Sequence, residues 1–167
     1  MLVKKTLDIV IPVLNEEKIL ADTVQELVAY ASENLSEYNW GILIADNGST
    51  DTTNTICLAL SKQEPKVSFT RLDKRGRGRA LKQAWINSDA DIVSYMDVDL
   101  STDLSALPVA ITAIVDEGYD IAIGSRLKQG AQVSGRSFMR EFISRSYSLL
   151  FRSMFRVRFR DAQCGFK

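Results

Sequence analysis

The sequence has no histidine and only two cysteines among its 167 residues. Histidine is the usual general base and a common zinc ligand, so its absence removes both options. Cys57 and Cys164 form neither a disulfide framework nor a metal-ligand spacing, and they indicate reduced thiols of a cytosolic protein. Any catalysis must therefore rely on carboxylates, on cationic side chains or on a hard metal ion.

A long apolar run is also absent. No stretch of about 18 apolar residues occurs, so no segment is predicted to span a bilayer. The apolar run within residues 1–11 is too short for a secretory signal. With 46% hydrophobic and 25% charged residues, the composition and length are those of one globular domain.

Charge is distributed unevenly along the chain. Residues 1–125 contain 11 Lys and Arg against 19 Asp and Glu, whereas residues 126–167 contain 10 against 2. We therefore divide the domain into an acidic part, 1–125, and a basic segment, 126–167, with different partners. Residues 161–167 (DAQCGFK) show no tapering into polar sequence, so we expect the basic segment to be incomplete and the chain to be truncated.

Short apolar segments alternate with amphipathic ones in the acidic part. Strands are predicted at 7–11, 41–45, 67–72, 91–96 and 119–123, and helices at 16–34, 51–62, 79–87 and 103–117. This alternation predicts an α/β fold with a mainly parallel sheet and helices on both faces. Ligands of such sheets bind beyond the carboxyl ends of the strands. The polar residues that follow the predicted strands are Asn15, Glu16, Asp46, Asp97, Asp99 and Arg126.

Asp97 and Asp99 directly follow a predicted buried strand. Alternate residues of an extended chain point the same way, so both carboxylates can face one ligand. Two adjacent carboxylates repel each other unless a cation lies between them, and Mg²⁺ or Mn²⁺ suits oxygen ligands and phosphate. A solvated turn rich in aspartate is the alternative interpretation.

A glycine-arginine loop occupies residues 74–79 (KRGRGR), ahead of a predicted helix. Glycine lets the backbone approach an anion, and a helix N-terminus favours negative charge. A diphosphate or a lipid phosphate is therefore a suitable ligand for Gly76, Arg77 and Gly78. An RNA-binding loop and a solvated turn remain alternatives, although the acidic part opposes nucleic-acid binding.

From residue 136 onward, apolar and aromatic residues recur at helical spacing between arginines. The pattern over 138–155 predicts a basic amphipathic helix, which is typical of an interfacial membrane helix. A helix that packs into a core and exposes its arginines is the alternative. An exposed apolar face would also favour a homo-oligomer.

With these residues in place, the chain resembles glycosyltransferase family 2 of the GT-A fold, and most of all its dolichyl-phosphate and polyprenyl-phosphate hexose synthases. The resemblance covers nearly the whole chain. It is carried by six segments, namely 10–16 (VIPVLNE), 44–51 (IADNGSTD), 76–80 (GRGRA), 96–100 (MDVDL), 124–126 (GSR) and 161–167 (DAQCGFK). Departures are Asn47, where the family usually has a second aspartate, and Ser101, where glutamine is common.

The resemblance implies a role for each matching residue. Pro12, Asn15, Glu16 and Asp46 would line the nucleotide pocket together with the glycine-arginine loop, and Asp97 and Asp99 would hold Mg²⁺ or Mn²⁺ on the diphosphate. Arg126 would bind the acceptor phosphate, with Arg136 and Arg140 as weaker candidates. Asp161 belongs to the acceptor-side motif. By the same resemblance, residues 1–125 would form the part that binds the nucleotide sugar. Residues 126–167 would form the acceptor-side or membrane-interface part.

We therefore expect an inverting transfer of a hexose from UDP- or GDP-hexose to polyprenyl phosphate. The enzyme would lie peripherally at the cytoplasmic face of a membrane, with an anchor conceivable beyond residue 167. One alternative is a family 2 enzyme that acts on a glycan hydroxyl. Another is a catalytically silent membrane-binding or nucleotide-sensing module.

Overall fold

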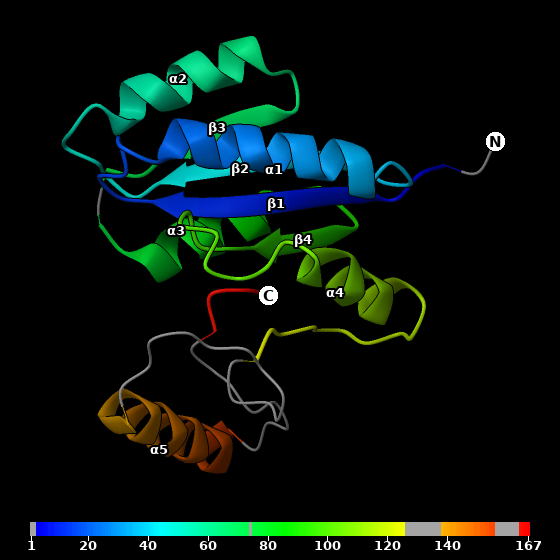
Figure 1. Ribbon diagram of the computed structural model, residues 1–167, viewed down its shortest axis with the longest axis vertical. Coiled ribbons are helices and arrows are strands. Elements are labelled where there is room, and N and C mark those ends of the chain that lie inside the picture. The colour runs from blue at the N-terminus through cyan, green and yellow to red at the C-terminus, as the bar shows by residue number, and fades with distance from the viewer. Residues whose placement is uncertain (1–2, 74, 126–137, 156–163) are drawn as a thin grey trace. The chain divides into compact units, whose positions relative to one another are not determined.

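The computed structural model describes residues 3–73, 75–125, 138–155 and 164–167. The chain divides into two compact units, residues 1–108 and residues 109–167. The first unit contains the whole sheet (Figure 1). The charge reversal that begins at residue 126 therefore falls inside the second unit.

Four parallel strands form the sheet, in the order β3-β2-β1-β4. They are β1 (Thr6–Val13), β2 (Asn39–Asp46), β3 (Val67–Arg71) and β4 (Ile92–Tyr95). The two central strands are almost continuously apolar, as expected for a sheet that is covered on both faces. Because all four strands run the same way, their carboxyl ends lie at one edge of the sheet.

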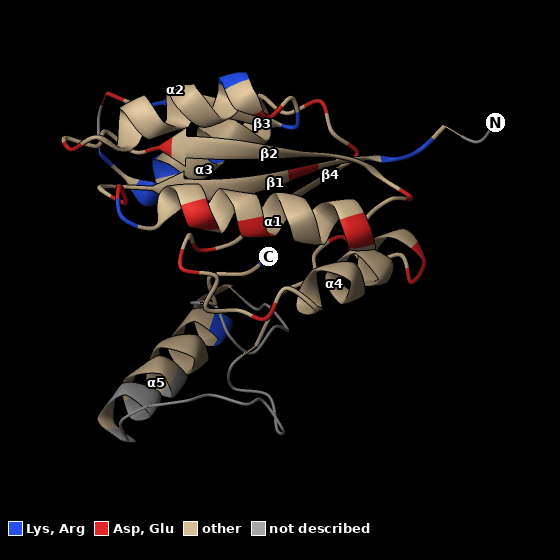
Figure 2. Ribbon diagram, turned by 45° about the horizontal axis from the view of Figure 1, so that its top comes forward, with Lys and Arg blue, Asp and Glu red and all other residues tan. Residues whose placement is uncertain are grey.

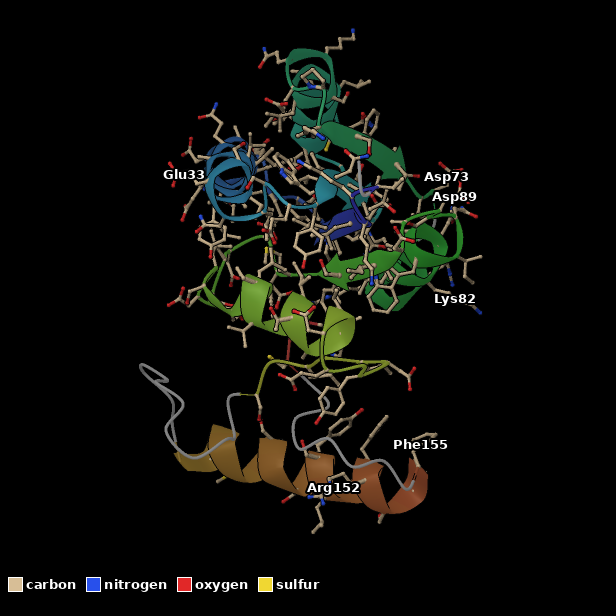
Figure 3. All side chains as sticks on the ribbon, turned by 90° about the vertical axis from the view of Figure 1, so that its right-hand side faces the viewer. Glu33, Asp73, Lys82, Asp89, Arg152 and Phe155 are labelled. Carbon is tan, nitrogen blue, oxygen red and sulfur yellow. The ribbon has the colours of Figure 1, made fainter. Side chains whose placement is uncertain are left out.

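Helices cover both faces of this sheet. They are α1 (Leu20–Asn34), α2 (Thr53–Gln63) and α3 (Arg77–Ile86). The chain moves outward from β1 to β3 and then returns to β4, so right-handed crossovers place α1 and α2 on one face and α3 on the other. Figure 3 shows this arrangement, with Glu33 of α1 and Lys82 of α3 on opposite sides of the strands. The predicted α/β class is confirmed.

The face beneath α3 has its own apolar cluster. Ala80 and Ala84 of α3 pack with Val10, Ala45 and Tyr95 of the strands. Strand order reverses between β1 and β4, and open α/β sheets bind their ligands at such a reversal. The packing of α3 therefore holds its first turn beside that point.

The predicted fifth strand at residues 119–123 is wrong, since this segment forms no strand. Tyr119 and Ile121 are 59% and 67% exposed, so the apolar residues that suggested a buried strand are not buried. The N–H of Gly124 donates to the carbonyl of Phe166 (3.1 Å). Residues 119–123 therefore have no place in the four-stranded sheet.

Helix boundaries differ from the predictions by a few residues. Residues 17–19 form a turn, so α1 begins at Leu20 instead of residue 16, and α3 begins at Arg77 instead of residue 79. The helix α4 (Ala106–Val115) is shorter at both ends than the predicted 103–117. In Figure 2, acidic residues are seen on α1 and on several loops of the first unit.

The second unit contains the predicted C-terminal helix as α5 (Phe138–Phe155). Its buried residues include Ser144 and Ser148, whereas a row of apolar side chains is 44–67% exposed, namely Met139, Ile143, Tyr147, Leu150 and Met154. The amphipathic character of this helix is therefore observed. Within the described ranges, every helix is too short or too polar to cross a bilayer.

Candidate functional site

Asp97 and Asp99 lie in the loop that follows β4. Val98 between them is buried, and its carbonyl accepts a hydrogen bond from the Thr23 hydroxyl of α1 (2.8 Å). Asp97 is partly exposed and Asp99 is exposed. The buried Val98 thus fixes the loop so that the two flanking carboxylates remain accessible.

The same loop closes with a tight turn. The N–H of Leu100 donates to the Asp97 carbonyl (3.1 Å), and the N–H of Ser101 donates to Asp99 Oδ1 (3.0 Å). Leu100 has a φ of 45°, a left-handed conformation that is uncommon for a branched side chain. Such backbone strain is often found at functional sites.

A pocket of about 460 Å³ lies at the carboxyl edge of the sheet. It brings together the last residues of β1, residues that follow β1, β2 and β4, and the first residue of α3. Its lining residues are Pro12, Val13, Leu14, Glu16, Asn47, Arg77, Asp97, Val98 and Asp99. Of the residues that the sequence assigned to the site, Pro12, Glu16, Arg77, Asp97 and Asp99 therefore share one pocket.

Arg77 and Asp97 form an ion pair within this pocket, between Nη2 and Oδ1. The guanidinium also lies over the ring of Tyr95, 5.7 Å from its centroid. The side chains of Arg77 and Asp97 are 53% and 32% exposed, so both can reach a ligand. A cationic side chain and the acidic pair are thus available at the same place.

Glu16 contributes a third carboxyl group to the pocket. Partial burial raises its pKa above the ordinary value, and the negative charges of Asp99 and Asp51 raise it further. Nearby carboxylates destabilise each other in this way when no cation separates them. The acidic side of the pocket is therefore suited to a cation.

Asn15 holds the loop after β1 and does not line the pocket. Its φ is 57°, a left-handed conformation that asparagine tolerates. Its N–H donates to Ser49 Oγ (3.0 Å), and its Oδ1 accepts the N–H of Thr50 (2.8 Å). The N–H of Glu16 donates in turn to Thr53 Oγ1 (2.9 Å). Asn15 thus positions Glu16 by tying the β1 loop to the β2 loop.

Asp46 is fully buried and is absent from the pocket lining. Its Oδ1 accepts the N–H of Ser49 (2.9 Å), and its Oδ2 lies 3.3 Å from Arg71 Nη1. That oxygen receives no well-aligned hydrogen bond. Arg71, which the sequence analysis did not single out, also donates to the Ser49 carbonyl (3.0 Å). Asp46 is thus buried and paired with Arg71, and the described pocket does not expose it to a ligand.

Asn47 connects the β2 loop to the glycine-arginine loop. Its Oδ1 accepts the N–H of Gly76 (2.6 Å), and its own N–H donates to the Val13 carbonyl (2.9 Å). An asparagine side chain can accept this bond without adding a negative charge. Gly76 and Gly78 do not line the pocket themselves. They flank Arg77, which does.

Four of the predicted acceptor-side residues have no described side chain. Arg126, Arg136 and Asp161 lie outside the described residues. Arg140 belongs to α5, but its side chain is likewise outside the description. Their roles stay predictions.

The residues present fit a divalent cation that prefers oxygen ligands. In the described part of the chain, no group of three or more acidic, cysteine or histidine side chains is arranged to hold a metal. Asp97 and Asp99 supply two carboxylates, and Mg²⁺ commonly completes its shell with phosphate oxygens and water. The guanidinium on Asp97 shows that this carboxylate already accepts a positive partner.

Comparison with known proteins identifies the family. The model of glycosyl transferase family 2 matches residues 8–166. Glycosyltransferase AglD of Haloferax volcanii is 32% identical over 160 residues, which cover 95% of this chain and 26% of that protein. The dolichyl-phosphate beta-glucosyltransferase of Drosophila melanogaster is 30% identical over 174 residues, which cover 96% and 53%. The chain thus spans between about a quarter and about half of the length of these relatives.

A solved structure shares the fold. The mannosyltransferase PcManGT of Pyrobaculum calidifontis, in complex with GDP-Man and Mn²⁺, superposes with a TM-score of 0.57 at 18% identity. The superposition covers 69% of this chain and 34% of that protein. At this identity the similarity concerns the fold alone. The family match, the GT-A arrangement of the parallel sheet and the acidic pocket at its edge agree, and the chain belongs to glycosyl transferase family 2.

Proposed function

We propose that this chain is the nucleotide-sugar part of a glycosyltransferase that moves a hexose from UDP- or GDP-hexose to polyprenyl phosphate, with inversion. The observation that carries the proposal is the convergence of Asp97, Asp99 and Arg77 in one pocket at the carboxyl edge of the sheet. Relatives named dolichyl-phosphate beta-glucosyltransferase and dolichol-phosphate mannosyltransferase support the acceptor class.

In this reaction an oxygen of the acceptor phosphate attacks the anomeric carbon as the bond to the nucleotide diphosphate breaks. A phosphate is already an anion near neutral pH, so no strong base is required, which suits a chain without histidine. Negative charge develops on the leaving diphosphate, and preorganised positive charge beside it lowers the barrier. Arg77 supplies part of that charge from the first turn of α3.

Asp97 and Asp99 would hold Mg²⁺ or Mn²⁺, which would supply further positive charge to the diphosphate. Glu16 strengthens the negative field that attracts the cation, and Pro12 and Val13 form the apolar wall of the pocket. Arg126, with Arg136 and Arg140, is proposed to bind the acceptor phosphate, and Asp161 to lie on the acceptor side. Arginine suits this role because its planar fork matches phosphate.

We further propose that the protein acts at the cytoplasmic face of a membrane, with α5 lying in the interface. The exposed apolar residues of α5, together with the excess of cations in residues 126–167, support this placement.

Calorimetric titration of UDP and of GDP, each with Mn²⁺ and with EDTA, tests the proposed site. Asp99→Asn removes one carboxylate ligand, and even outer-shell changes weaken metal sites about tenfold or more, so we expect Mn²⁺-dependent nucleotide affinity to fall at least about tenfold. Asp89→Asn is the matched control, because Asp89 is an exposed aspartate that precedes β4 and therefore lies toward the amino ends of the strands. Nucleotide affinity that changes neither with Mn²⁺ nor with Asp99→Asn would falsify the assignment of Asp97 and Asp99 as metal ligands.

A further inference from the structure

We propose that Arg77 is an exchangeable counter-ion of the acidic pair. Its guanidinium competes with the divalent cation for Asp97, and once displaced it binds the diphosphate of the sugar nucleotide. This inference rests on the proposed function, which supplies the diphosphate ligand. It adds a coupling device to the pocket, in which one arginine links metal binding to nucleotide binding.

The first step of the argument is the competition for Asp97. The guanidinium of Arg77 occupies Asp97 Oδ1, an oxygen of a carboxylate that is proposed to hold the metal. A divalent cation on the same carboxylate would lie within a few ångströms of the guanidinium, and like charges at that distance repel strongly. Metal binding at Asp97 therefore expels Arg77 from its partner.

The second step is that Arg77 has room to move. It is the first residue of α3, and its side chain is 53% exposed. A side chain at Gly78 would meet nothing within 4 Å, so the backbone beside Arg77 is not crowded. The guanidinium already lies over the face of Tyr95, 5.7 Å from the ring centroid, and this cation–π contact does not depend on Asp97.

The third step is the destination of the guanidinium. Arginine binds phosphate oxygens with two parallel N–H bonds, and the first turn of a helix adds a favourable dipole for an anion. Arg77 and Asp99 line the same pocket, so a diphosphate held by the acidic pair through a cation lies within reach of the arginine. An arginine that leaves Asp97 thus gains a new anionic partner in the nucleotide.

These three steps couple the binding of the cation to the binding of the nucleotide. A cation that binds alone must displace Arg77 and leaves it without its carboxylate. A cation that binds together with a nucleotide displaces Arg77 onto the diphosphate. Metal and nucleotide therefore favour each other by more than their direct contact, and the linkage is reciprocal.

Electron paramagnetic resonance of Mn²⁺ with the 167-residue chain measures this competition directly. Arg77→Gln removes the competing charge, so we expect it to bind Mn²⁺ alone about three- to fivefold more tightly, a modest gain because the ion pair is partly exposed. We expect the same variant to bind UDP or GDP in the presence of Mn²⁺ about tenfold more weakly, because a charge-assisted phosphate contact is lost. Opposite changes in the two affinities distinguish exchange from a general loss of the site.

Lys82→Gln is the matched control, since Lys82 lies on the outer side of the same helix (Figure 3) and is expected to leave both affinities unchanged. Arg77→Lys keeps the charge without the fork, so its Mn²⁺ affinity should match the wild type and its nucleotide affinity should be intermediate. If Arg77→Gln fails to give the wild-type circular dichroism spectrum, Arg77→Ala, which also removes the charge, takes its place in both titrations. Unchanged or weaker binding of Mn²⁺ alone by Arg77→Gln would overturn the exchange.

The failure of the proposed function would look different. Asp97→Asn should abolish Mn²⁺ binding with and without nucleotide. If Asp97→Asn binds Mn²⁺ as the wild type does, the metal ligands are wrongly assigned, and the exchange of Arg77 is wrong as well. If Asp97→Asn loses Mn²⁺ binding while Arg77→Gln gains no Mn²⁺ affinity, the metal site is supported and only the exchange is wrong.

Discussion

Glu16 shows how charges interact at the scale of single residues. The group lies partly buried beside Asp99 and Asp51, and its pKa is raised above the ordinary value of 4.5. An acid with a raised pKa in the folded protein releases its proton more easily in the unfolded chain. Its ionisation therefore destabilises the fold as pH rises above 4.5, and below that value the penalty disappears.

Glu16→Gln tests whether ionisation of Glu16 destabilises the fold. We expect the variant to be more stable than the wild type at about pH 7 and to show no gain at about pH 4. Urea unfolding followed by tryptophan fluorescence is the measurement, because Trp40 and Trp85 both lie in the first unit. Glu33→Gln, at an exposed position of α1, is the control. An equal gain in stability at both pH values would show that the variant is stabilised by a change in packing and not by the loss of the Glu16 charge.

Asp46 shows, for a single residue, what the sequence could not predict. The sequence places Asp46 directly after the predicted strand 41–45, and in the structure it is the last residue of β2. Its ion pair with Arg71 depends on the register of β3 with β2, which pairs Asp46 with Arg71. No local pattern in the sequence carries that register, so the exposure of Asp46 was not predictable.

At the scale of elements, α1 holds the acidic loop in place. The hydroxyl of Thr23 donates to the buried carbonyl of Val98, between the two aspartates. A buried carbonyl that loses its donor costs about 1–3 kcal/mol. The helix thus contributes to the site although none of its residues lines the pocket.

Thr23→Val replaces the hydroxyl with a methyl group of similar size. We expect a loss of about 1–3 kcal/mol in the free energy of unfolding, together with weaker Mn²⁺ affinity, because the loop is no longer anchored. Thr23→Ser keeps the hydroxyl and should retain Mn²⁺ affinity. Equal Mn²⁺ affinity in Thr23→Val and the wild type would show that the loop holds its shape without this bond.

Most of the elements were predicted from the spacing of their apolar residues. Strands β1 to β4 and helices α1 to α5 all occur near their expected places, because apolar periodicity is a local property. Residues 119–123 have the same apolar character but form no strand. Whether an apolar segment joins a sheet depends on a neighbouring strand with free hydrogen-bonding groups, and the segment itself does not encode one.

At the scale of the whole molecule, the proposed membrane contact rests on the exposed apolar row of α5. If this proposal holds, the excess of Lys and Arg in residues 126–167 would complement an anionic lipid surface. We expect co-sedimentation with phosphatidylglycerol vesicles, weaker binding to phosphatidylcholine, and a decline with salt.

Leu150→Gln combined with Met154→Gln removes two exposed apolar side chains from α5. We expect vesicle affinity to fall about tenfold or more, since each buried apolar group contributes about 1–3 kcal/mol. Ile86→Gln, an equally exposed position at the end of α3, is the control. If the double variant binds vesicles as the wild type does and instead loses self-association, the apolar row is a contact between copies of the chain.

The sequence alone determined the parallel α/β class, the acidic pair after β4 and the amphipathic helix near the C-terminus. These features follow from local periodicity and from the rule that parallel strands end at one edge. Only the tertiary structure decided that Asp46 is buried and paired with Arg71, that Arg77 pairs with Asp97 and that Thr23 anchors the loop of Asp97. Such partnerships join residues at least 20 positions apart, and they form only when the folded backbone brings their side chains within hydrogen-bonding distance.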